Sequence, residues 1–286
     1  MTVKIPEKAQ DAFQENMEGG NKIELPFPAP PFYVLNGDAN FEELGGVLFF
    51  GGFGASEKNV KTAAEQWENC PYPIPGFQEK ELKQDGQKIR SLISRSLIVA
   101  PIGMRLFSTI KGADNKIKRY PPFTKKARPA IQVLVYLGYL TETKQITPWA
   151  PPILTAKTLH VNDNQKASTN WKKAITPFME EIAPGMPSSI TNLFWMNLGT
   201  FGQKANFEIH GESFITPVSA FIPEDLDAKK VENRYVGDSV AEFMADMAAK
   251  SEEWLKAYSK LAPAQAAADG SDVPEPELPP EDDIPF

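Results

Sequence analysis

The stretch IQVLVYLGYL, residues 131–140, is almost wholly apolar and carries no charge. Short apolar runs rich in β-branched and aromatic residues predict buried β-strands. Similar runs recur between Gly- or Pro-containing turns, and they predict further strands at 33–37, 45–54, 97–107, 153–161, 190–198, 205–215 and 218–222. Several short strands separated by turn signals favour a β-barrel or a β-sandwich core.

Helical periodicity is confined to three segments, at 58–69, 162–182 and 238–261. The second should be broken at Pro177, because proline removes a backbone donor. The third is the clearest, since apolar residues recur at three- and four-residue steps from Val240 to Leu261. The pattern predicts a β-rich α+β fold with helical insertions and a C-terminal helix.

The two ends of the chain differ from the middle in composition. Residues 1–24 are polar and predict an N-terminal arm, while residues 25–262 predict a single globular domain. Residues 263–286 are rich in Pro, Ala and acids, and they lack the apolar surface that would offset the entropy of ordering. We therefore expect a disordered acidic tail.

The net charge of −7 is concentrated in this tail. Residues 264–286 contain seven Asp and Glu residues and no Lys or Arg, which leaves 30 acidic and 30 basic side chains in the rest of the chain. The acidic pI is therefore a property of the tail. The neutral remainder can present a local basic surface.

Composition argues against several classes of protein. With one cysteine (Cys70) and two separated histidines (His160 and His210), neither a disulfide framework nor a metal site is expected. No apolar run is long enough for a membrane helix, and the N-terminus lacks the apolar core of a signal peptide. No nucleophile motif, phosphate-binding loop or cofactor signature is present. We expect a cytoplasmic protein that is neither an enzyme nor cofactor-dependent.

The last residues, EDDIPF at 281–286, end an acidic stretch with an apolar tip. Carboxylates can steer such a tip towards a basic surface, and a Phe ring can fill a pocket there. This sequence resembles the C-terminal tip of bacterial and phage single-stranded DNA-binding proteins. The resemblance covers the tip and its acidic linker, and it implies an OB-like barrel with added elements and a nucleoid-associated role. The implied partner-binding residues are Asp282, Asp283, Ile284, Pro285 and Phe286.

Residues 111–128 carry seven cations against one acid, with two aromatic rings among them. Cations can follow the phosphates of single-stranded DNA while aromatic rings stack on its bases. The predicted DNA-binding residues of this segment are Lys111, Lys116, Lys118, Arg119, Tyr120, Phe123, Lys125, Lys126 and Arg128. Second-tier candidates outside it are Trp149, Trp171, Lys172 and Lys173.

These features favour a protein that coats single-stranded DNA in replication, recombination or repair and recruits other enzymes through its tip. The tail would also compete with DNA for the basic residues. The alternative is a strand-annealing recombination protein that self-associates into rings or filaments. Its assembly face could be 238–261, although core packing is the more expected role of that helix. A nucleic-acid enzyme that carries the same tail is a weaker alternative, because clustered metal-binding acids are missing.

Overall fold

The computed structural model describes residues 25–257, apart from 28, 30, 44–46, 66–71, 73–74, 85–86, 112–116, 123, 126, 150–153, 159–160, 200–207, 210–212 and 215–218. The predicted N-terminal arm, the end of the C-terminal helix and the acidic tail lie outside these residues.

The described chain is a β-rich α+β fold. Its strands are β1 (Pro31–Glu43), β2 (Val47–Ser56), β3 (Gln78–Gln84), β4 (Gln87–Ser94), β5 (Ser96–Lys111), β6 (Ile117–Tyr120), β7 (Arg128–Leu140), β8 (Ile146–Pro148), β9 (Leu154–Thr158), β10 (Met196–Gly199), β11 (Glu208–Ile209), β12 (Ser213–Phe214) and β13 (Ser219–Ala220). Its helices are α2 (Glu57–Glu65), α3 (Val161–Ile182), α4 (Ala228–Glu232), α5 (Asp238–Lys250) and α6 (Glu252–Lys256), with a 3₁₀ turn, η1, at Ser188–Leu193.

The strands join in one sheet, with the order β13-β10-β5-β7-β9-β1-β2-β4-β3 along its main path. The pairing of β1 with β9 is parallel, and the other pairings are antiparallel. Strands β4 and β5 are separated only by Arg95, yet they pair at different places in the sheet. The hydroxyl of Ser94 accepts from the backbone N–H of Ser96 and donates to its carbonyl at this bend.

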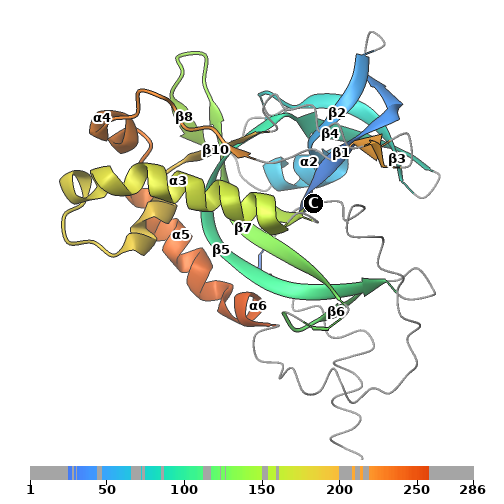
Figure 1. The fold of residues 1–286 in the computed structure, drawn as a ribbon. Helices are drawn as coiled ribbons and strands as arrows, with labels where there is room; N and C mark the ends of the chain where they lie inside the picture. Colours follow the sequence, from blue (N-terminus) through green and yellow to red (C-terminus); the bar gives the residue numbers. More distant parts are fainter. Residues whose placement is uncertain are drawn as a thin grey trace, which may run out of the picture.

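Strands β5 and β7 form the centre of the molecule and appear as two long, curved arrows (Figure 1). Both faces of β7 are buried, which explains why its sequence is continuously apolar instead of alternating. Val135 and Leu137 belong to the large core that also contains Trp171 of α3. Leu134 and Tyr136 point the other way, into two smaller cores shared with α5 and α6.

The buried apolar residues of each helix show which face of the sheet the helix covers. Trp171 and Ile175 of α3 are buried in the large core. Met244 and Met247 of α5 and Trp254 of α6 are buried in the smaller cores. The sheet is therefore packed on both sides (Figure 1).

Two helix predictions need correction. Pro177 lies inside α3 without ending it. Pro177 is itself exposed, whereas Trp171 and Ile175 in the preceding turns are buried, so tertiary packing outweighs the missing backbone bond. The predicted helix 238–261 is instead two helices, α5 and α6, which meet at Ser251. Among the residues described, no helix is long and apolar enough to cross a membrane.

Candidate nucleic-acid interface

The predicted basic segment includes a strand that the sequence did not indicate. β6 pairs with the end of β5, placing Thr109 opposite Arg119 and Ser108 opposite Tyr120. On the other side of β5, the register places Thr109 opposite Arg128, at the start of β7. Arg119 and Arg128 therefore flank Thr109 in one row across three strands. Because Arg119 and Arg128 come from different strands, no sequence pattern predicts that they lie in one row.

The guanidinium of Arg119 is anchored on an aromatic ring. Its Cζ lies 5.5 Å from the centre of the Phe107 ring, and Phe107 is fully buried. Arg105 approaches the same ring, with its Cζ at 5.9 Å. Guanidinium groups commonly stack on aromatic faces in this way.

Between β6 and β7, the described residues of the segment form a turn. The backbone N–H of Thr124 donates to the carbonyl of Pro121 at 3.3 Å, and the N–H of Ala127 donates to the carbonyl of Thr124 at 3.1 Å. Tyr120 is half-buried at the end of β6, and Lys125 is exposed in the turn. The structure therefore brings Tyr120 and Lys125 to the same end of the sheet as Arg119.

Several predicted residues can be placed only in part. Lys111, Lys118 and Arg128 lie on β5, β6 and β7, respectively. Lys116, Phe123 and Lys126 lie outside the described residues, as do Asp282, Asp283, Ile284, Pro285 and Phe286.

The tryptophan predictions are corrected by burial. The side chains of Trp149 and Trp171 are 0% and 2% exposed, and both belong to the large core. Stacking on a base needs an accessible ring face. Trp171 has instead the guanidinium of Arg234 near its ring, with Cζ 5.2 Å from the ring centre. Burial lowers the pKa of Arg234.

Lys172 and Lys173 are neighbours on α3 but lie in different surroundings. Lys173 is exposed. Lys172 lines a cavity of about 220 Å³ together with Ser168 and Thr169 of the same helix and Asn192 of η1. No sequence motif points to these three polar residues, although Ser168 and Lys172 stand four positions apart on one helix face.

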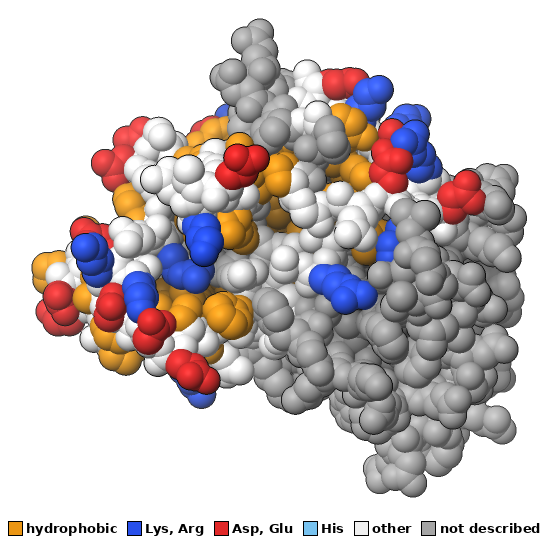
Figure 2. Space-filling view, turned by 90° about the horizontal axis from the view of Figure 1, so that it is seen from above, with side chains coloured by type: hydrophobic (Ala, Val, Ile, Leu, Met, Phe, Trp, Pro, Cys, Tyr) orange, Lys and Arg blue, Asp and Glu red, His pale blue; other side chains and the backbone are white. Residues whose placement is uncertain are grey.

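The face in Figure 2 carries both signs of charge. Lys and Arg side chains lie among Asp and Glu side chains, and hydrophobic side chains are visible between them. Among the described side chains on this face, neither sign of charge forms an unbroken patch.

The proposed assembly face has another role in the structure. The apolar residues Met244, Met247 and Trp254 of the C-terminal helices are buried within the chain itself. This explains the apolar periodicity of 238–256 without self-association.

Within the described part of the chain, no group of three or more His, Cys, Asp or Glu residues could hold a metal ion. Comparison of the sequence with protein-family models and curated proteins, and of the structure with solved structures, gives no match.

Proposed function

We propose that this protein binds single-stranded DNA through the end of the β5–β6–β7 sheet. The observation that carries this proposal is the row formed by Arg119, Thr109 and Arg128 across three strands. Tyr120 and Lys125 follow at the same end. The two cationic residues in register lie on one face of the strands, while Tyr120, the next residue of β6, lies on the other face and Lys125 in the turn beyond. A single strand that passes this end of the sheet can contact cations with its phosphates and a ring with a base.

The fold proposed for this function is an OB-like barrel with added elements. Two observations support it. The sheet combines an antiparallel majority with the parallel β1–β9 pair, and the bend at Arg95 lets two consecutive strands pair at separate places in the sheet. Barrels of the OB type bind single-stranded nucleic acids on a strand face and in adjoining loops.

The acidic tail supplies the second part of the proposal. Asp282, Asp283, Ile284, Pro285 and Phe286 dock on replication or repair proteins, as the resemblance of EDDIPF implies. The seven carboxylates in residues 264–286 also compete with DNA for the basic row. The protein would act in the cytoplasm of a bacterial or phage-infected cell.

The interface is tested by equilibrium binding of fluorescent oligo-dT to three variants of the full chain. Arg119→Gln and Lys125→Gln should each weaken binding, and each should reduce the slope of log affinity against log salt by about one phosphate contact, roughly 0.7 for a single strand. Lys144→Gln is the matched control, because Lys144 is an exposed lysine in another turn, between β7 and β8. Equal affinities and slopes for all three variants would remove this surface from the interface.

A further inference from the structure

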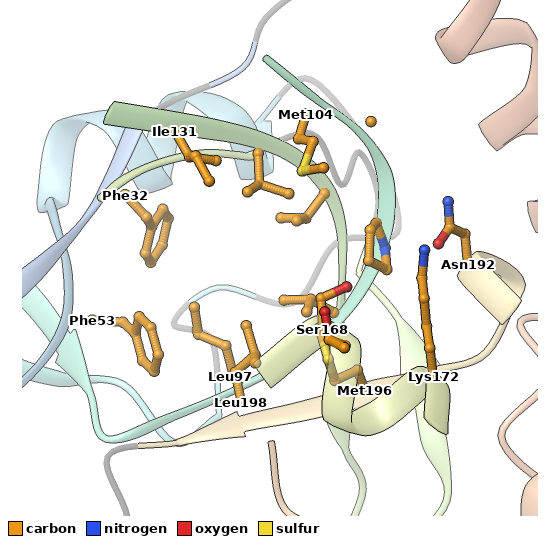
Figure 3. A pocket seen from close by; sticks show the side chains of 16 residues that line it. Phe32, Phe53, Leu97, Met104, Ile131, Ser168, Lys172, Asn192, Met196 and Leu198 are labelled. Carbon is orange, nitrogen blue, oxygen red and sulfur yellow. The ribbon is translucent and has the colours of Figure 1, made fainter. Parts of the chain in front are cut away.

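The cavity lined by Lys172 is apolar inside and polar on one side. Phe32 and Phe53, both buried, lie on one side of it, and Ser168, Lys172 and Asn192 lie on the opposite side (Figure 3). Met104, which is 60% exposed, also lines the cavity and marks its opening to solvent. The remaining lining is mostly aliphatic, and none of the described lining residues is acidic.

The polar side determines which ligand chemistry fits. The Oδ1 of Asn192 is buried and has no hydrogen-bond partner among the described residues, so a turn of its amide towards the cavity would let it accept from an N–H group of a ligand. The ammonium of Lys172 attracts a carboxylate. A ligand that matches both groups combines an apolar body, an N–H donor and a negative charge. An acidic peptide with an apolar anchor has all three.

A nucleobase matches this cavity less well. A base that entered from a DNA strand would keep its sugar at the opening, and its hydrogen-bonding edge would face the apolar interior. Burying that edge without partners is costly. By contrast, a phenyl ring suits the interior, since a protein cavity of about 150 Å³ is large enough for benzene and this one measures about 220 Å³.

We propose that the cavity binds the segment Ile284–Phe286 of the same chain. The Phe286 ring enters the apolar interior, a backbone N–H of the segment donates to Asn192 Oδ1, and the carboxylate of Asp283, the residue directly before the segment, pairs with Lys172. The sequence has this chemistry at 281–286, where acids run directly into Ile-Pro-Phe.

The tail is joined to the described chain at a point from which its tip can reach the cavity. Leu255 of α6 packs against Gly103 from the face of the sheet opposite the cavity, and the backbone of Gly103 also lines the cavity. The described chain ends two residues later, at Ala257. Residues 258–283 then supply 26 residues of chain. A flexible chain of this length has a root-mean-square reach of about 30 Å, so the segment has a high effective concentration at the cavity.

Seating the segment in the cavity has a consequence for partner docking. While Phe286 is buried there, it is not available to another protein. The tail carboxylates are also proposed to compete with DNA for the row of Arg119, Thr109 and Arg128. The contact in the cavity is separate from that competition, because other residues form the cavity.

The test places a photo-crosslinker in the full chain by the substitution Phe286→p-benzoylphenylalanine and uses no DNA. Benzophenone reacts readily with methionine, and both Met104 and Met196 line the cavity. We expect crosslinks within one chain to Met104 or Met196. Lys172→Glu should lower the yield of these crosslinks at least fivefold. Lys172→Gln should also lower the yield.

Lys173→Glu is the matched control, since it makes the same charge change at the next, exposed position of α3, and its yield should stay within twofold of the parent. Thermal unfolding verifies that the variants are folded. Crosslinks that map mainly to β6, that form only between chains, or that respond equally to both glutamate substitutions would overturn the proposal. Because DNA is absent, this result is independent of whether the protein binds single-stranded DNA.

Discussion

The guanidinium carbon of Arg105 lies 3.9 Å from the centre of the Trp254 ring. This contact joins β5 to α6, the last described helix. Arg105 is only 5% exposed, and its Nε donates to Oε1 of Gln132 on β7 at 2.8 Å. Its Nη1 also donates to the backbone carbonyl of Trp254 at 3.3 Å. The Trp254 ring therefore covers a cation that two strands and a helix hold in place.

Trp254→Ala should destabilise the protein by about 3–5 kcal/mol, because it removes a large buried side chain and exposes the Arg105 site. The measurement is urea unfolding of the full chain. Lys256→Ala is a control on the same helix. Lys256 pairs with Glu252 at the surface, so its loss should change the free energy of unfolding by less than about 1 kcal/mol. Equal effects for the two variants would mean that α6 contributes little to the fold.

Substitution by alanine should change the stability differently at two glycines, one on β2 and one on β5. A Cβ at Gly52 would lie 2.8 Å from the backbone carbonyl oxygen of Ser94, whereas a Cβ at Gly103 would meet only the methyl groups of Leu255, at 2.9 Å. A side-chain end can move more easily than a paired strand. Gly52→Ala should therefore cost about 1–3 kcal/mol, and Gly103→Ala should cost less. The reverse order in urea unfolding would contradict the pairing of β2 with β4.

Tyr72 should make stability depend on alkaline pH. Burial, followed by the nearby charge of Glu57, raises the pKa of Tyr72 above its ordinary value, and its hydroxyl donates to Glu57 Oε1 at 3.3 Å. The unfolded chain then loses this proton at lower pH than the folded chain. The stabilisation is complete below the ordinary tyrosine pKa and is lost as the pH rises through the folded value.

The measurement for Tyr72 is urea unfolding of the parent and of Tyr72→Phe at several pH values from 8 to 11. The free energy of unfolding should fall more steeply with alkaline pH in the parent than in Tyr72→Phe. Parallel curves for the two proteins would show that Tyr72 titrates alike in the folded and unfolded states.

Aromatic substitutions should distinguish DNA contact from core packing. Tyr120→Ala should weaken binding to oligo-dT by about 1–3 kcal/mol if its ring stacks on a base. Trp171→Phe should leave the affinity of the folded fraction unchanged, because Trp171 is 2% exposed in the core, and should lower thermal stability instead. A large loss of affinity in Trp171→Phe, with Tyr120→Ala unaffected, would reverse this assignment.

The sequence predicted the elements whose own residues carry the signal. The run 131–140 is buried on both faces of β7, and the predicted strands at 45–54 and 153–161 correspond to β2 and β9. Helix 58–69 corresponds to α2, with Val60 and Ala64 in the core as its apolar face requires.

The parts that the sequence could not predict depend on partners distant in the chain. The burial of Trp149 and Trp171 follows from packing between β7, α3 and their neighbours, which no local pattern records. Likewise, the row of Arg119 and Arg128 arises from the register of β6 and β7 on β5. Pro177 does not break α3, because the tertiary burial of Trp171 and Ile175 stabilises this helix, and local propensity contains no information about that burial.

The central claim is that the chain binds single-stranded DNA, and its most direct test is equilibrium binding of the full chain to oligo-dT and to duplex DNA of equal length across a range of salt concentrations. The account predicts tighter binding to the single strand at every salt concentration and an affinity that falls linearly on a log–log plot as salt rises. Equal or tighter binding to the duplex, or no salt-dependent binding to either DNA, would contradict it.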